Sequence, residues 1–234
     1  MCSSDLQFFW STLFVHKDVL YILGATTLFG NLHISASYDE GETWTVPVTL
    51  MYGGRAYSYG AGIHKGPMQV VTHKGRLYTT IEYASFLESR NFGVMADFSP
   101  AVISIDENDD LLCPENWKCT GFSNYEGKWK EECEKNAAES QVIAGTGAVT
   151  ETKVKRGDAI EGNVVVGPDG KLYSYLRWKV GEAVVFSIDE NDPEAPLTFE
   201  KIIKMPVTDS LFRILRYNDK YYLITNRKTE VSGK

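Results

Sequence analysis

The sequence predicts an all-β fold in which repeated antiparallel sheets are arranged as the blades of a propeller. Three observations lead to this prediction. Apolar and polar residues alternate with a period of two through most of the chain, clusters of Gly, Asp and Asn mark turns between these segments, and one short pattern occurs four times. A meander that repeats in this way cannot bury both of its faces alone, so its copies must pack on one another.

The composition is that of a globular protein of 234 residues, with 43% hydrophobic and 24% charged residues. Asp and Glu outnumber Lys and Arg by 31 to 24, and the net charge of −7 gives no electrostatic footprint for nucleic acid or an anionic membrane surface. The apolar runs are too short to span a membrane. An aromatic share of 12% suits strands and surfaces that stack on sugars.

The repeated pattern is a strand, a two-residue turn signal, and a second strand that opens with an aromatic residue. A further β-rich segment follows each of the first three copies, at 32–37, 101–106 and 184–189. Each copy is therefore expected to start one blade. The four copies are His16–Tyr21, His73–Tyr78, Pro168–Tyr173 and Tyr217–Tyr222.

The spacing of these copies predicts about four blades in one domain that covers residues 1–234. The first and second copies are 57 residues apart and the third and fourth are 49 apart, which suits one blade each. The 95 residues between the second and third copies include a polar insert at about 113–158. This insert is either a long loop or a degraded blade, and 126–138 is the best helical candidate in the chain.

The four cysteines do not have the spacing of a metal site. Cys113, Cys119 and Cys133 lie within the polar insert, and Cys2 stands alone near the N-terminus. Their separations lack the close pairs and the histidine partners that zinc sites use. Loop thiols or one local disulfide are expected, and the sequence calls for neither a metal nor a cofactor.

One turn carries a motif that is specific for a superfamily. The segment Ser37–Trp44 reads Ser-Tyr-Asp-Glu-Gly-Glu-Thr-Trp and matches the Ser-x-Asp-x-Gly-x-x-Trp pattern. Asp39 can accept hydrogen bonds from backbone N–H groups of the turn, Gly41 supplies a positive φ, and Trp44 packs back on the blade. This motif resembles the Asp box of sialidases and related propellers. The resemblance implies a six-bladed parent fold, with the Asp box on the outer rim.

A second segment, Glu161–Arg177, resembles bacterial exo-sialidases. A Glu opens one strand, an Arg closes the next after 16 residues, and an Asp-Gly hairpin lies between them. In the family the Glu polarises a tyrosine nucleophile, and the Arg is one of three that bind the substrate carboxylate. The resemblance therefore implies that Glu161 is catalytic and that Arg177 binds substrate. A guanidinium matches a carboxylate in a two-pronged geometry that Lys cannot copy.

Three further residues are candidates for the same site. Where the family has an acid/base Asp in a loop before a Pro, this chain has His64, which we expect to be a catalytic proton donor. Glu82 lies on an expected inner strand and is a candidate substrate-binding residue, either as a second acid or as a partner for an arginine. Arg213 is a further candidate substrate-binding residue. We expect Glu161, Arg177, His64 and Glu82 to converge on one side of the propeller axis.

The sequence thus predicts an exo-glycosidase that removes an acidic sugar from a glycan. Two alternatives remain: a polysaccharide lyase, in which His64 and a tyrosine would move the proton while Arg177 neutralises a uronate, and a non-catalytic glycan-binding propeller. The resemblance places the third arginine and the tyrosine nucleophile beyond Lys234. It also favours a secreted or periplasmic protein, although residues 1–5 show no signal peptide. Carbohydrate is the expected partner.

Overall fold

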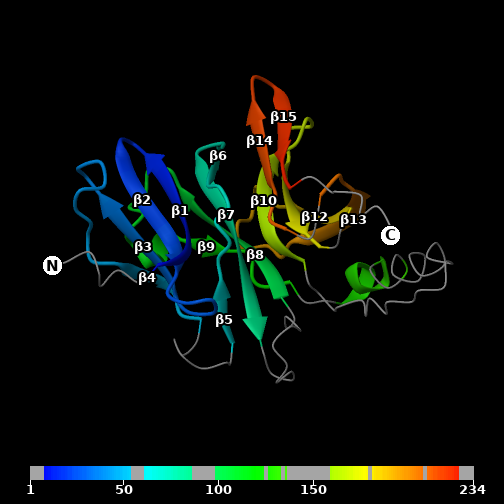
Figure 1. The fold of residues 1–234 in the computed structure, drawn as a ribbon, viewed down its shortest axis with the longest axis horizontal. Helices are drawn as coiled ribbons and strands as arrows, with labels where there is room; N and C mark the ends of the chain where they lie inside the picture. The colour runs from blue at the N-terminus through cyan, green and yellow to red at the C-terminus, as the bar shows by residue number, and fades with distance from the viewer. Residues whose placement is uncertain are drawn as a thin grey trace, which may run out of the picture.

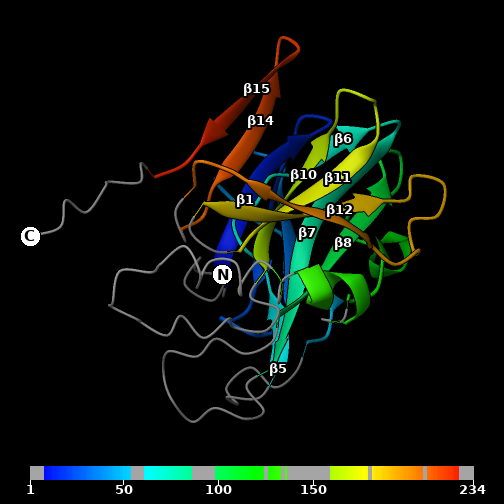
Figure 2. The ribbon, with the colours of Figure 1, turned by 90° about the vertical axis from the view of Figure 1, so that its right-hand side faces the viewer.

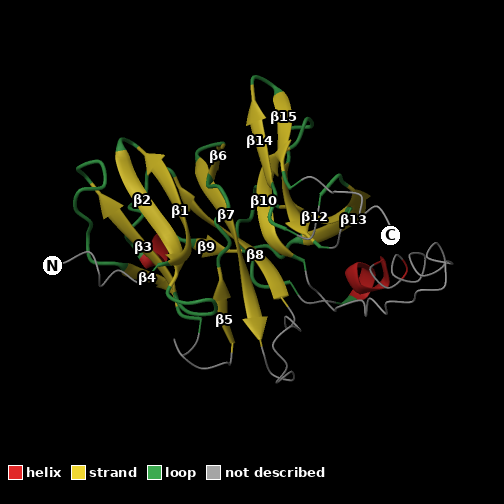
Figure 3. Cartoon of the chain, viewed as in Figure 1, coloured by secondary structure: helices red, strands yellow, loops and turns green. Residues whose placement is uncertain are grey.

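A computed structural model describes residues 8–53, 61–85, 98–123, 126–132, 135, 159–178, 181–207 and 210–226 of the chain. Within these residues, fifteen strands form four antiparallel sheets, and the remaining structure is mostly loop (Figure 3). The predicted all-β class is confirmed. The sheets lie side by side in sequence order (Figure 1), so each can be treated as one blade.

The strands follow one another as meanders. The first sheet contains β1 (Phe9–His16), β2 (Val19–Ala25), β3 (Leu32–Ser37) and β4 (Val48–Met51). The second contains β5 (Ala61–His64), β6 (Val71–His73), β7 (Arg76–Ser85), β8 (Phe98–Asp106) and β9 (Lys118–Cys119). The third contains β10 (Ile160–Val166), β11 (Leu172–Arg177), β12 (Glu182–Ile188) and β13 (Thr198–Lys204). The fourth is the hairpin of β14 (Arg213–Tyr217) and β15 (Lys220–Ile224).

The four repeated patterns are four hairpin turns, one in each sheet. Lys17 and Asp18 in the first turn, and Asn218 and Asp219 in the last, have positive φ at both central positions. This geometry belongs to type I′ turns, whose twist matches that of the paired strands. The turn signals in the sequence therefore predicted the strand pairing because Asp and Asn adopt this backbone more readily than other non-glycine residues.

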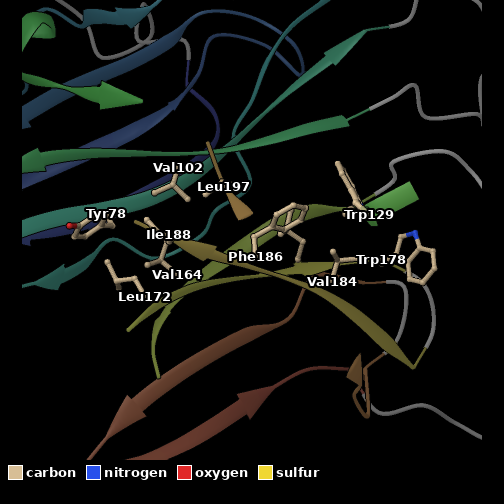
Figure 4. Packing of buried hydrophobic residues seen from close by; sticks show 12 residues of the cluster. Tyr78, Val102, Trp129, Val164, Leu172, Trp178, Val184, Phe186, Ile188 and Leu197 are labelled. Carbon is tan, nitrogen blue, oxygen red and sulfur yellow. The ribbon is translucent and has the colours of Figure 1, made fainter. Parts of the chain in front are cut away.

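Each sheet packs its face on the next one. Leu23 and Ile34 of the first sheet share a buried cluster with Ile81 and Ile103 of the second. A second cluster joins Tyr78 and Val102 of the second sheet to residues of the third, among them Val164, Leu172 and Phe186 (Figure 4). Val165 faces the opposite way from Val164 and packs against Phe212 and Ile214. Because successive strand residues point to opposite faces, one sheet can contact both neighbours.

The first sheet and the hairpin have exposed apolar side chains at the two ends of this series. Leu13 and Val15 on β1 are exposed, as are Tyr217, Tyr222 and Ile224 on the hairpin. The hairpin projects away from the other sheets in both views of the chain (Figures 1 and 2). Among the residues that the structure describes, no further sheet covers these exposed side chains.

The polar insert begins by completing the second blade. Its residues Lys118–Cys119 form β9, which pairs with β8 at Ile103 and Ser104. Residues 127–132 and 135 are helical, and Trp129 packs its ring edge-on against Phe186 at 5.1 Å. Residues 136–158 lie outside the described part of the chain, so the choice between loop and degraded blade stays a prediction there.

The described cysteines, Cys113 and Cys119, are free thiols. Cys2 and Cys133 lie outside the described residues. Among the residues that the structure describes, no helix is long and apolar enough to cross a membrane.

Candidate functional site

The site begins at a bulge in β10, the first strand of the third blade. The pairing of β10 with β11 shifts between Ile160 and Asn163, and Glu161 within this bulge has φ 56°. A β-bulge re-aims a side chain, and a positive φ at a residue other than glycine is a strained conformation that the surroundings must hold. The bulge turns the Glu161 carboxylate toward Arg177, with 2.6 Å between Oε2 and Nε.

A second buried pair lies beside the first. His64, the last residue of β5, is opposite Glu82 on β7, and its Nδ1 is 2.8 Å from Glu82 Oε2. The other carboxylate oxygen of Glu82 accepts a hydrogen bond of 3.3 Å from the backbone N–H of Gly162. Since Gly162 follows Glu161, Glu82 connects the two pairs. Glu161, Arg177, His64 and Glu82 therefore form one cluster across the second and third blades.

Three aromatic rings surround the imidazole of His64. The ring centroids of Phe98, Trp10 and Phe29 lie 5.4, 5.8 and 6.0 Å from that of His64. The His64 side chain is 3% exposed as a result. An ionised carboxylate only accepts hydrogen bonds, so the contact with Glu82 selects the imidazole form that carries its proton on Nδ1.

Burial controls the electrostatics of Glu161, whose side chain is 2% exposed. Desolvation raises the pKa of this carboxyl above its ordinary value, and the negative charge of Glu82 acts in the same direction. Arg177 and His64 oppose the shift but do not cancel it. A carboxyl group with a raised pKa can both take up and release a proton nearer to neutral pH, as acid/base catalysis requires.

Lys65 is a residue of this region that the sequence did not single out. It is fully buried, and burial lowers its pKa from 10.5 to about 7, an effect that Glu82 opposes and Arg213 reinforces. Its Nζ donates to the backbone oxygens of Gly66 at 2.6 Å and Met68 at 3.3 Å. These contacts close the loop 65–70 between β5 and β6. No local signal predicts this burial, because an isolated Lys in a loop is normally exposed.

The loop 65–70 touches every other blade. Thr12 of the first blade donates to the carbonyl of Met68 at 2.8 Å, and Arg213 of the fourth donates to the carbonyl of Pro67 at 2.6 Å. A Cβ added at Gly66 would lie 3.0 Å from Cγ of Glu161 in the third. The loop therefore packs directly on the Glu161 side chain, and its position depends on contacts from the other blades.

Arg213 belongs to a set of polar residues at one register position. In each hairpin, one residue on the first strand is paired with the repeated tyrosine. The position two residues before that paired residue holds Thr12, Gln69, Asn163 and Arg213 in the four blades. Gln69 donates to the carbonyls of Val164 and Ile214, and Asn163 donates to that of Phe212. These side chains join the first strands of adjacent blades. The hydrogen bond from Arg213 to the Pro67 carbonyl is structural, and the role of Arg213 as a substrate ligand stays a prediction.

The remaining features lie apart from the cluster. An open cleft of about 510 Å³ is lined by Trp129, Phe186 and Phe199, and shares no residue with it. In the described part of the chain, no group of three or more His, Cys, Asp or Glu side chains could hold a metal ion. Asp39 accepts hydrogen bonds from the backbone N–H and the hydroxyl of Thr43 at 2.8 and 2.6 Å, in the exposed turn between β3 and β4.

Solved structures with a similar fold include two kinds of glycoside hydrolase. The chain has the fold of the sialidase-like β-propellers. A GH43 β-1,3-galactosidase matches with a TM-score of 0.54 and 14% identity, over 96% of this chain and 70% of that one. A GH43 protein from Bacillus licheniformis matches with a TM-score of 0.51 and 14% identity, over 94% and 37%. A sialidase from Trypanosoma rangeli matches with a TM-score of 0.51 and 14% identity, over 93% and 34%.

The suspected resemblance to sialidase-like propellers is thus confirmed at the level of the fold. The chain spans only about a third of the length of the Bacillus licheniformis protein and of the sialidase, at 37% and 34%. No protein-family model and no curated protein sequence matches the chain.

Proposed function

We propose that this chain is the site-bearing part of a glycoside hydrolase that binds an acidic sugar through Arg177 and cleaves its glycosidic bond. The observation that carries the proposal is the buried cluster in which Glu161 contacts Arg177 at 2.6 Å and Glu82 links this pair to His64. A buried carboxyl group with a raised pKa that is held among other charged groups, as Glu161 is, is characteristic of functional sites. The propeller fold shared with known glycosidases supports the same class of reaction.

Arg177 is the accessible charge of the cluster and therefore the proposed anion ligand. Its side chain is 19% exposed, whereas that of Glu161 is 2% exposed. Glu161 faces the Nε, and a guanidinium carries four further N–H donors on its two terminal nitrogens. A sugar carboxylate can be bound by such donors in a two-pronged geometry. The protein is acidic overall, so a specific cation is needed to hold an anionic ligand.

Glu161 is the proposed proton-transfer group. Its raised pKa suits it to take a proton from a hydroxyl nucleophile as that group attacks the sugar. A neutral nucleophile activated by a carboxylate avoids the repulsion that a second carboxylate would exert on an acidic substrate. His64, whose Nδ1–H is held by Glu82, is the proposed proton donor to the leaving group, and it acts in its doubly protonated form through Nε2.

The burial of the cluster favours a second candidate function, glycan binding without catalysis. Glu161 and His64 are 2% and 3% exposed, so a substrate reaches them only if neighbouring groups move. Arg177 is more exposed, at 19%, so it is the group of the cluster that an acidic sugar reaches most directly. In this second reading, Glu161 and His64 hold Arg177 and the neighbouring strands in place.

The two candidates are distinguished by measuring binding and turnover on the same variants. Calorimetry with N-acetylneuraminate, D-glucuronate and neutral D-glucose gives the binding constants, and the fluorescence of released 4-methylumbelliferone from the corresponding glycosides gives turnover. Arg177→Ala should weaken binding of the acidic sugars at least about tenfold and leave glucose unchanged. Arg216→Ala, which removes an exposed arginine paired with Asp219, is the matched control.

Glu161→Gln should keep the binding constants and reduce turnover about a hundredfold or more. Glu200→Gln, an exposed change on β13, should alter neither. Binding that depends on Arg177 without turnover would support the glycan-binding candidate. Ultraviolet absorbance of an unsaturated uronate would support the lyase, and acidic-sugar binding that is equal in Arg177→Ala and the unmodified protein would overturn the proposal.

A further inference from the structure

Trp10 has an unusual backbone and an unusual exposure for a tryptophan in a strand. It lies in β1 where the pairing with β2 shifts between Phe9 and Thr12, and its φ is 49°. For a bulky residue this conformation is strained, at a cost of about 1–3 kcal/mol. Its side chain is nevertheless 43% exposed, so burial of the ring does not account for the strain. The bulge instead turns a large apolar ring toward solvent.

Trp10 occupies the position in the first blade that Glu161 occupies in the third. Both residues lie four positions before the residue opposite the repeated tyrosine, Tyr21 in one blade and Tyr173 in the other. Both lie in the bulge and have positive φ, at 49° and 56°. Phe9, the residue before Trp10, is paired with Ala25, whereas Ile160, the residue before Glu161, is paired with Arg177. The first blade thus presents an aromatic ring where the third presents an ion pair.

The Trp10 ring also contacts the charged cluster. Its centroid is 5.8 Å from that of His64, and it stacks on Phe9 at 5.9 Å with an interplanar angle of 23°. His64 is bonded to Glu82, which is bonded to the backbone beside Glu161. The half-exposed ring of Trp10 is therefore connected to the half-buried cation Arg177 through a continuous set of contacts.

We propose that Trp10 is a stacking platform for the apolar face of a sugar ring whose charged or polar groups point toward the third blade. This inference rests on the proposed carbohydrate function and deepens it. A pyranose has one face of C–H groups and a rim of hydroxyls, so it suits an aromatic ring placed next to hydrogen-bonding groups. The exposed face of Trp10 contributes contact area at little conformational cost because the bulge, Phe9 and His64 already fix its orientation.

The test follows the indole N–H signals of the full 15N-labelled chain during sugar titrations. The sequence contains 5 tryptophans, and Trp10→Phe assigns one signal to Trp10 by its loss. The probes are D-glucuronate and D-galactose. We expect both sugars to shift the Trp10 signal and to leave that of Trp44 in place, because Trp44 lies in the turn that Asp39 organises.

Binding constants of two variants measure the platform itself. Trp10→Ala should weaken both sugars about tenfold, whereas Trp10→Phe, which keeps an aromatic face, should weaken them less than about threefold. Trp44→Phe should leave both constants unchanged. If Trp10→Ala disturbs folding, as circular dichroism would show, the indole shifts and Trp10→Phe still decide the outcome.

The outcomes separate this inference from the proposed function. Sugar binding that shifts the Trp10 signal, with no loss of glucuronate binding in Arg177→Ala, would retain the platform and overturn the acidic specificity. Glucuronate binding that depends on Arg177, with the Trp10 signal unmoved and its variants unaffected, would overturn the platform alone. If neither sugar moves any indole signal at saturating concentration, the platform is also overturned.

Discussion

Glu82 and Arg177 occupy the same register position in two neighbouring blades. Each lies four residues after the repeated tyrosine of its blade, which is Tyr78 for Glu82 and Tyr173 for Arg177. Glu82 is paired with His64 and Arg177 with Ile160, and in both blades the regular pairing of the inner strand is interrupted directly after that partner. One repeated position thus carries a carboxylate in the second blade and a guanidinium in the third. Both charges then meet through Glu161 and Gly162. The pseudo-repeat places opposite charges at one end of the adjacent blades, because the strand from the repeated tyrosine to the charged residue is unbroken in both.

The Glu161–Arg177 pair should behave as a strongly coupled unit in unfolding experiments. Arg177→Met leaves a buried carboxylate without its cation and should lower the free energy of unfolding by about 3 kcal/mol. Adding Glu161→Gln to this variant should recover at least about 1 kcal/mol, because the unpaired charge is then absent. Urea denaturation of the two single variants and the double variant measures this coupling. Additive losses would contradict it, and Arg216→Met should cost less than about 0.5 kcal/mol.

Lys65 should make the protein more stable as the pH rises above 7. Its pKa is about 7 in the folded chain, whereas in the unfolded chain we expect the ordinary value of 10.5. Between pH 7 and pH 10.5 the Lys65 amine is therefore protonated in the unfolded chain and mostly neutral in the folded chain. The free energy of unfolding therefore increases with pH through this window. The full shift corresponds to a folded-state penalty on the order of 5 kcal/mol below pH 7.

Replacing Lys65 should remove this dependence. Lys65→Met is expected to be more stable than the unmodified chain at pH 6 and to show a flatter profile up to pH 10, as measured by urea denaturation. The gain will be smaller than the full penalty because the hydrogen bond to the Gly66 carbonyl is also lost. Lys201→Met, an exposed change on β13, should leave the profile unchanged. An equally steep profile in Lys65→Met would show that Lys65 does not cause it.

Much of the fold was predictable because its signals are local. Asp18, Asn218 and Asp219 are residue types that adopt positive φ readily, and their turns are flanked by alternating strands, so these hairpins could be placed from the sequence. Glu161 and Arg177 could be brought together for the same reason, since the Asp169–Gly170 hairpin between them sets their register. Their proximity follows from one local turn.

The rest of the site depends on contacts between blades. The burial of Lys65 follows from a loop that Thr12, Arg213 and Glu161 hold from three other sheets, and no stretch of sequence contains that information. The bulges at Trp10 and Glu161 have positive φ without glycine, so they carry no turn signature. The outer strand β9 was likewise hidden within the polar insert, because two residues are too short for a visible alternation.

Asp39 should stabilise its turn in a pH-dependent way without affecting the site. Hydrogen bonds from Thr43 are the largest cause that lowers the pKa of its carboxyl below the ordinary 3.8. This stabilisation is therefore present above pH 3.8 and is lost as the pH falls through the lower folded-state pKa. Asp39→Asn should reduce the melting temperature at pH 7 and flatten its decline in acid, while sugar binding stays unchanged. Asp189→Asn, which removes the negative charge from the acceptor of the Asn191 N–H, is the comparison.

Finally, the exposed strands at the two ends of the blade series should cause the 234-residue chain to self-associate. Leu13 and Val15 on β1 are 60% and 67% exposed, and Ile224 on β15 is 57% exposed. Contiguous apolar strand surface favours pairing with another chain. We expect the sedimentation coefficient of the unmodified chain to rise with concentration and its surface to bind the dye ANS. The double change Leu13→Lys and Val15→Lys should reduce both effects, because charges on an exposed strand oppose association. Val46→Lys changes an equally exposed residue outside the strands and should reduce neither. If the unmodified chain sediments as a monomer at all concentrations, these strands do not associate.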